Sequence, residues 1–112
     1  MNDTSVTNRF LEIFYKLSQI PRESGKEKRF ADFLEEFAKE NNLECYRDKN
    51  NNVLIKKSGN KKNNEPIILQ AHMDMVCVKR ENSNHDFDTD PIEIVRNGDM
   101  ISAKDTSLGA DQ

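Results

Sequence analysis

Long hydrophobic runs, closely spaced cysteines and an excess of basic residues are all missing from this sequence. No apolar run approaches the ~20 residues that a membrane-spanning helix needs, and the polar N-terminus lacks the charged-then-apolar pattern of a signal peptide. Cys45 and Cys77 lie too far apart in the sequence to form a close metal-binding or redox pair. We therefore expect two free, buried or half-buried thiols in a reducing cytoplasm, and no membrane partner.

Charge and apolar content limit the class of protein further. The net charge of −3 gives no reason to expect a nucleic-acid partner. The densest basic stretch, around residues 56–62, surrounds a Gly/Asn loop and predicts a solvated loop rather than a binding patch. With 112 residues, 35% of them hydrophobic and 33% charged, the chain is at most one domain, and it has little apolar material for a self-contained core.

Two amphipathic helices are predicted near the N-terminus. One covers residues 4–19, where apolar side chains recur at helical spacing, and it ends before Pro21. The other covers residues 26–41, with Ser24 as its N-cap and Glu27 three residues later in a capping-box pattern. We expect both helices to cover a sheet. The buried stripe of the second helix consists of Phe30, Phe33, Leu34 and Phe37.

Glu35 and Glu36 form the only adjacent carboxylate pair in the chain, and such a pair could supply a metal ligand and a general base. At about 100° per residue, both lie more than a quarter turn from the centre of the apolar stripe of their helix. They belong to the solvated face, and a catalytic role is rejected.

Five short strands are predicted after the helices. Residues 43–46 and 53–55 form a hairpin around an Asp/Asn-rich turn, and residues 92–95 and 100–103 form another around Asn97-Gly98. The continuous apolar run from Ile67 to Leu69 predicts a central strand over residues 67–71 that is buried on both faces. The fold class is therefore α/β, with two helices packed on a mixed β-sheet.

His72 and Asp74 follow this central strand at the point where it ends. Residues i and i+2 of an extended segment point to the same side, so the two side chains can face one site. A neutral imidazole there is a good zinc ligand, and a nearby carboxylate can hold the other ring nitrogen. The alternative is an ordinary strand-to-loop junction, because an isolated His-x-Asp tripeptide is common.

Two further polar segments carry candidate ligands. The loop over residues 79–91 contains His85, Asp86, Asp88 and Asp90, which could bind calcium, but it lacks the central Gly and terminal Glu of the twelve-residue calcium loop. A surface segment with Asx turns is the favoured interpretation. Near the C-terminus, a Gly-Ala-Asp loop places Asp111 after a strand, which alone is weak evidence for a carboxylate ligand.

Together these segments resemble the opening half of the co-catalytic zinc peptidases, the family of aminoacylases, carboxypeptidases and dipeptidases, and within it the aminoacyl-histidine dipeptidases. The resemblance covers nearly the whole chain in the right order and spacing. The motifs that carry it are residues 20–25 (IPRESG), 69–76 (LQAHMDMV), 85–87 (HDF) with 90–92 (DPI), and 108–111 (LGAD).

The resemblance implies a site of two zinc ions, with Mn²⁺ or Co²⁺ as substitutes. His72 resembles a ligand to one ion, Asp111 the carboxylate that bridges both, and Asp74 the catalytic carboxylate that steadies the imidazole. Two such ions polarise a scissile carbonyl and activate a water at neutral pH. The implied reaction is hydrolysis of small peptide substrates, namely dipeptides of the Xaa-His type and broader.

The resemblance also implies missing parts. The family has a Glu-Glu pair, a further acidic ligand, a distant His and a dimerisation domain after the bridging carboxylate, whereas this chain ends one residue past Asp111. Residues 1–112 are therefore expected to be the N-terminal portion of the catalytic domain of a homodimeric enzyme, and to be inactive alone. The alternative is a truncated non-catalytic product or binding domain. Where the family pattern has Gly before two threonines, this chain has Asp105, a residue that tolerates left-handed geometry.

Overall fold

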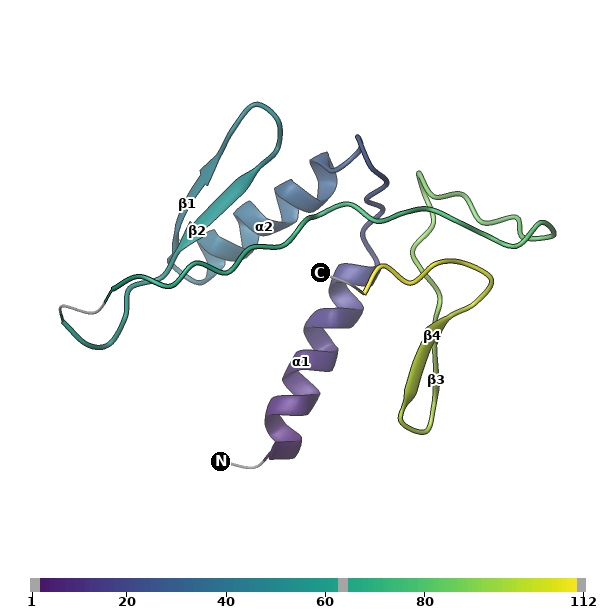
Figure 1. Cartoon of the computed structure of the whole chain (residues 1–112), viewed down its shortest axis with the longest axis horizontal. Coiled ribbons are helices and arrows are strands. Elements are labelled where there is room, and N and C mark those ends of the chain that lie inside the picture. Colours follow the sequence, from purple (N-terminus) through teal and green to yellow (C-terminus); the bar gives the residue numbers. More distant parts are fainter. Residues whose placement is uncertain (1–2, 63–64, 111–112) are drawn as a thin grey trace.

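The computed structural model describes residues 3–62 and 65–110. Two helices, α1 (Asp3–Ser18) and α2 (Lys28–Glu40), are followed by strands β1 (Glu44–Arg47), β2 (Val53–Lys56), β3 (Ile94–Asn97) and β4 (Met100–Ala103). β1 pairs with β2 and β3 with β4, both antiparallel, and within the described ranges the two hairpins form separate sheets (Figure 1). The predicted α/β class is confirmed, with a correction: two small antiparallel sheets replace the single mixed sheet.

α2 packs on the β1–β2 hairpin and contributes most of the buried core. Ala31 and Ala38 are fully buried, and their small side chains let the helix approach the strands closely. Side chains alternate along the hairpin, so that Cys45 and Ile55 are half-buried while Tyr46 and Leu54 are exposed. This alternation is typical of a sheet with one covered face.

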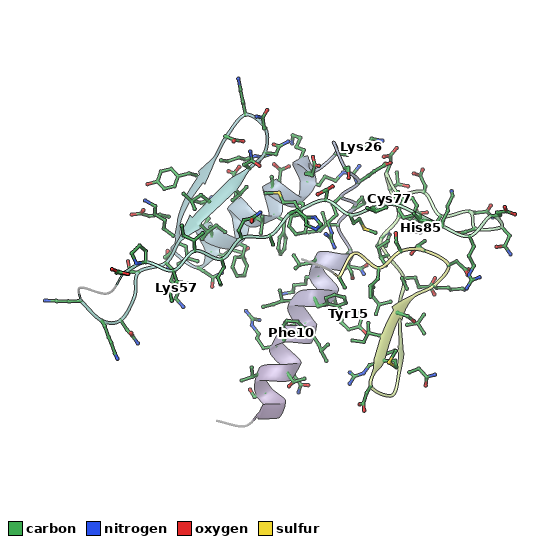
Figure 2. The ribbon with its side chains drawn as sticks, viewed as in Figure 1. Phe10, Tyr15, Lys26, Lys57, Cys77 and His85 are labelled. Carbon is green, nitrogen blue, oxygen red and sulfur yellow. The ribbon has the colours of Figure 1, made fainter. Side chains whose placement is uncertain are left out.

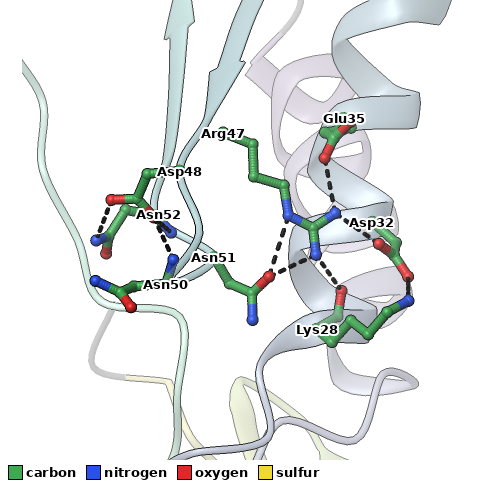
Figure 3. A network of polar contacts seen from close by, with 8 residues as sticks. All are labelled: Lys28, Asp32, Glu35, Arg47, Asp48, Asn50, Asn51 and Asn52. Atoms are coloured by element: carbon green, nitrogen blue, oxygen red, sulfur yellow. Dashed lines mark hydrogen bonds and ion pairs between the residues drawn. The ribbon is translucent and has the colours of Figure 1, made fainter.

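An ion-pair network fixes the hairpin on α2 (Figure 3). Arg47 Nη1 lies 2.6 Å from Asp32 Oδ1 and 2.7 Å from Glu35 Oε1. The hydrogen bonds from these carboxylates raise the pKa of Arg47, and the guanidinium lowers the pKa of Asp32. Glu35 thus has a structural role at the surface and Glu36 is exposed, which confirms the predicted solvated face.

Turn chemistry places both hairpins as predicted, with small shifts at their ends. Asp48 Oδ1 accepts the backbone N–H groups of Asn50 at 2.8 Å and Asn52 at 2.9 Å, and Asn51 has a φ of +68°. In the other hairpin Gly98 has a φ of +62°. β3 begins two residues later than expected, because Ile92 is buried and its N–H donates to Ser18 O of α1 at 3.1 Å.

The predicted central strand is wrong for the described structure. Residues 67–71 are extended, but they pair with no strand within residues 3–62 and 65–110, and Figure 1 shows them in a long unpaired trace. Ile67, Ile68 and Leu69 are 87%, 84% and 93% exposed. An apolar run indicates burial, but burial on two faces also requires neighbouring strands, and the two hairpins of this structure pair only with themselves.

α1 also departs from the expected role of covering a sheet. Val6 and Phe10 are 53% and 68% exposed, and Phe10, labelled in Figure 2, lies on the part of α1 that extends away from α2. Further along, α1 lines an apolar cavity of about 340 Å³ shared with Ile101 and Leu108. Neither described helix has the length and apolar content needed to cross a membrane.

The chain exposes more surface than a self-contained domain of its size. Its accessible surface is 9175 Å², whereas a folded monomer of 13.0 kDa exposes about 6,300 Å². Its radius of gyration is 16.3 Å, against about 13 Å for a compact domain of this length. The apolar faces of α1 and of residues 67–69 account for part of this open surface.

Candidate functional site

The His72–Asp74 pair is present at the end of the extended segment. His72 Nδ1 lies 2.8 Å from the backbone carbonyl oxygen of Asp74 and 3.1 Å from its Oδ1. A carbonyl oxygen can only accept, so the ring proton is on Nδ1. In this tautomer Nε2 is the nitrogen that would ligate a metal. The structure thus brings the two predicted residues together; their predicted metal and catalytic roles stay predictions.

Ser24 holds the other side of the Asp74 carboxylate. Its hydroxyl donates to Asp74 Oδ2, and a parallel bridge between Glu23 and Met75 places the two segments side by side. In that bridge the Met75 N–H donates to Arg22 O at 3.0 Å. The hydrogen bond from Ser24, and then that from His72, lower the pKa of Asp74.

The predicted N-cap role of Ser24 is therefore wrong. α2 begins at Lys28 with Glu27 as its N-cap, and no side-chain hydrogen bond caps it. Glu27 Oε1 instead accepts the Gly25 N–H at 2.7 Å. The Ser24 hydroxyl donates to Asp74, and Glu27 accepts the N–H of Gly25 rather than that of Ser24, so the Ser-x-x-Glu pattern makes neither side-chain bond of a capping box.

The segment before Asp111 runs antiparallel to the segment after Asp74. The Ser107 N–H donates to Val78 O at 2.8 Å, the Ser107 hydroxyl donates to Val76 O at 2.6 Å, and Thr106 forms a bridge with Lys79. Asp105 begins this stretch with a φ of +61°, the left-handed geometry foreseen at this position. Asp111 itself lies outside the described residues.

Arg22 joins the two segments and was not singled out from the sequence. Its side chain is only 6% exposed. Nη1 donates to Met73 O at 2.9 Å and Nη2 donates to Gly109 O at 2.7 Å. The only sequence signal was its position inside the IPRESG motif, which predicted a polar turn between two helices.

The acidic loop is a surface segment, linked to the turn before α2 by an ion pair between Asp88 Oδ1 and Lys26 Nζ at 2.6 Å. Asp86 Oδ1 accepts the Asp88 N–H at 2.9 Å, as in an Asx turn, and Asp90 Oδ2 accepts the Asp86 N–H at 2.9 Å across the loop. The His85 ring packs on Phe87 with centroids 4.6 Å apart. Its Nε2 is buried and makes no hydrogen bond within the described residues. The surface interpretation of this loop is confirmed.

Both cysteines are free and half-buried, as predicted. Burial raises the pKa of the Cys77 thiol, and its Sγ donates to Met75 O at 3.6 Å. Within the described residues, Cys77 belongs to no group of three or more side chains that could hold a metal ion.

The His72 imidazole and the Asp74 carboxylate together fit part of a metal site. An imidazole whose second nitrogen is held by a carboxylate is the usual arrangement around zinc in proteins. Within residues 3–62 and 65–110, no three His, Cys, Asp or Glu side chains lie close enough to hold an ion. The described residues therefore supply one ligand and its orienting partner, and a complete site needs donors beyond them.

Comparisons with known proteins identify relatives. No protein-family model matches the chain. Over 102 residues it is 39% identical to the cytosol non-specific dipeptidase of Escherichia coli (strain K12), a match that covers 89% of this chain and 21% of that protein. The crystal structure of aminoacylhistidine dipeptidase from Vibrio alginolyticus matches with a TM-score of 0.83 and 39% identity, again over 89% of this chain and 21% of that one. In sequence and in fold, the chain therefore corresponds to a segment that makes up about a fifth of these dipeptidases.

Proposed function

We propose that the native protein containing this sequence is a metal-dependent dipeptidase, and that His72, Asp74 and Asp111 belong to its site. The carrying observation is the His72–Asp74 pair, with Nδ1 held at 2.8 and 3.1 Å by a residue that Ser24 fixes in turn. The 39% identity to a dipeptidase over 89% of the chain supports the reaction class. The geometry of the His72–Asp74 pair and the sequence identity to a dipeptidase are independent observations.

Each residue has a separate role in this proposal. His72 and Asp111 would hold zinc, with Mn²⁺ or Co²⁺ as substitutes, in a complete site of two ions. Bound metal would supply a Lewis acid for the scissile carbonyl and an activated water at neutral pH. Asp74 keeps the proton of the imidazole on Nδ1, so that the lone pair of Nε2 points toward the ion.

The substrates in this proposal are small peptides, dipeptides of the Xaa-His type and broader. The names of the two relatives, a non-specific dipeptidase and an aminoacylhistidine dipeptidase, support this substrate class. Two free thiols support a cytoplasmic location. We further propose a homodimer, on the resemblance to the aminoacyl-histidine dipeptidases, with no nucleic-acid or membrane partner.

We also propose that residues 1–112 are the N-terminal portion of a larger catalytic domain. Supporting this, the chain spans about a fifth of the length of its relatives and exposes 9175 Å² of surface, roughly half as much again as a compact monomer of its mass. The apolar side chains of residues 67–69 would then be buried by strands from elsewhere in the protein.

Metal content and dipeptide turnover of the native protein test the function. His72→Ala should lose zinc and turnover, while His85→Ala, which removes the only other histidine of this 112-residue sequence, should keep both. Equal zinc content and turnover in wild type and His72→Ala would exclude the proposed site.

Two further variants separate the roles. Asp111→Ala should be the most severe, because loss of a bridging carboxylate leaves two cations close together with less compensation. Asp74→Ala should lose roughly 10–100-fold in metal affinity or activity, and excess zinc should partly restore it. Near-normal turnover with two metals bound in Asp111→Ala would contradict the bridging role.

A further inference from the structure

We propose that Arg22 is a positioning residue that sets the spacing between the His72–Asp74 pair and the loop that leads to Asp111. The metal role of this contact rests on the proposed function. The contact itself is a property of the described fold, and it can be tested separately.

The geometry connects three parts of the chain through one guanidinium group. Nη1 donates to Met73 O, 51 residues away in sequence, and Nη2 donates to Gly109 O, 87 residues away. Met73 is the residue between His72 and Asp74, and Gly109 is two residues before Asp111. One rigid group therefore spans the two segments that carry the predicted site residues.

Because Arg22 is buried, its guanidinium group depends on the carbonyl groups of Met73 and Gly109 as hydrogen-bond acceptors. Arg22 is 6% exposed, and a buried cation is costly unless its donors are satisfied. The guanidinium carbon also lies 5.2 Å from the centroid of the Phe30 ring of α2, within cation–π range. Its own backbone carbonyl accepts the Met75 N–H at 3.0 Å. Besides the two carbonyl groups, the Phe30 ring and the backbone bond to Met75 therefore hold Arg22 in place.

The chemistry favours arginine over lysine at this position. A guanidinium presents several N–H donors in a planar, rigid fork, so two of its nitrogens can bond two separate carbonyl groups at a fixed distance. A lysine ammonium keeps the charge, but it is a single point donor on a flexible stem. Lysine would hold one of the two segments and leave the other free to move.

The fit around Gly109 gives independent evidence for close contact at this point. Gly109 has a φ of +68°, and a Cβ there would lie 2.9 Å from Met75 Cβ and 3.1 Å from Arg22 Nη2. The loop therefore packs against Met75 at a distance that only glycine allows. Because a misplacement of about 1 Å can cost 10²-fold in catalysis, this spacing matters to any site built from both segments.

The test compares Arg22→Met and Arg22→Lys with wild type in the native protein. The zinc dissociation constant is measured by competition with a chromophoric chelator, and amide hydrogen exchange is measured over residues 72–75 and 107–110. Ala38→Gly is the matched control, because Ala38 is fully buried in α2, which packs on the β1–β2 hairpin, and it makes no hydrogen bond to either segment within the described residues.

Both Arg22 variants should weaken zinc binding by roughly 10–100-fold, the usual effect of losing a group that orients metal ligands. Amides in both segments should exchange about tenfold faster, as expected for the loss of one hydrogen bond to a charged donor. Ala38→Gly should lower the thermal midpoint without changing the zinc dissociation constant of the folded protein. That contrast separates positioning from general stability.

Other results would overturn the proposal. If Arg22→Lys has the zinc affinity and amide exchange rates of wild type, the positive charge and its contact with the Phe30 ring suffice, and the bridge between the two carbonyl groups has no role. Arg22→Lys also provides the test if Arg22→Met does not fold. Faster exchange at residues 72–75 alone would show that Gly109 is held by other contacts. If wild type itself binds no zinc, the proposed function fails, and exchange in the two segments still decides whether Arg22 joins them.

Discussion

The hydroxyl of Ser24 donates a hydrogen bond to the carboxylate of Asp74, 50 residues later in the sequence. Ser24 donates to Oδ2 and the imidazole of His72 donates to Oδ1, so each carboxylate oxygen of Asp74 has its own donor. A carboxylate held in this way cannot rotate about its terminal bond without breaking one of the two contacts. Ser24 therefore fixes the plane of the group that orients His72.

Ser24→Ala should consequently weaken metal binding in the native protein. Removing the donor frees the Asp74 carboxylate to rotate, and loss of such an outer contact typically costs about 10–100-fold in metal affinity or activity. Zinc titration followed by elemental analysis measures the effect. Ser58→Ala, in the exposed loop after β2, is the control and should bind zinc as wild type does. Identical titrations for the two variants would remove Ser24 from the site.

Gly109→Ala should destabilise the fold by about 2–4 kcal/mol, from left-handed backbone strain and overpacking together. The φ of +68° disfavours a Cβ, and the added atom would meet Met75 Cβ at 2.9 Å. Gly59→Ala is the matched control, since its φ is not in the left-handed region and its nearest neighbour would be 4.0 Å away. Denaturant unfolding of both variants measures the difference. Equal midpoints would show that the loop does not pack closely on Met75.

Features with local causes could be predicted from the sequence. Asp and Asn residues predicted the β1–β2 turn because the Asp48 side chain bonds the backbone of its own turn. The left-handed φ of Asp105 was expected from the resemblance, because the family pattern has glycine at this position and aspartate tolerates such geometry better than most residues. His72 and Asp74 met because two residues of one extended segment need no distant partner to lie together.

Features that depend on contacts between distant residues could not be predicted from the sequence. Ser24 matches a capping box by its spacing to Glu27, and only the position of Asp74 in space determines where its hydroxyl bonds. Arg22 bonds two carbonyl groups 51 and 87 residues away, and no local pattern specifies them. The apolar run at residues 67–69 predicted a buried strand, which is wrong for this structure, because burial depends on neighbouring strands that the run itself does not specify.

Acid should weaken the β1–β2 hairpin through Asp48. The Asn52 side chain, followed by backbone N–H groups of Asn52 and Asn50, lowers the Asp48 pKa in the folded state. A lowered folded pKa means that the stabilisation is complete above the unfolded value of about 3.9 and is lost as the pH falls through the folded value. Amide exchange across β1 and β2, followed from pH 5 to pH 2, should show this loss.

The matched variants for this titration are Asp48→Ala and Asp99→Ala, the latter in the turn of the other hairpin. Asp48→Ala should have a weaker β1–β2 hairpin at pH 5 and little further change on acidification. Asp99→Ala should retain the wild-type acid dependence of β1 and β2. An unchanged acid response in Asp48→Ala would place the titrating group elsewhere.

The 112-residue chain by itself should have no peptidase activity, with or without added zinc or manganese. Its described residues supply one imidazole ligand and no cluster of three donors, and the sequence contains no adjacent carboxylate pair outside the surface of α2. A positioned general acid–base group alone contributes about 10²–10⁴-fold. Hydrolysis of β-alanyl-histidine by the purified chain is the assay, with the Escherichia coli dipeptidase as positive control. Turnover that survives repurification and disappears in His72→Ala would contradict this prediction, because it would mean that the open chain completes the site without further residues.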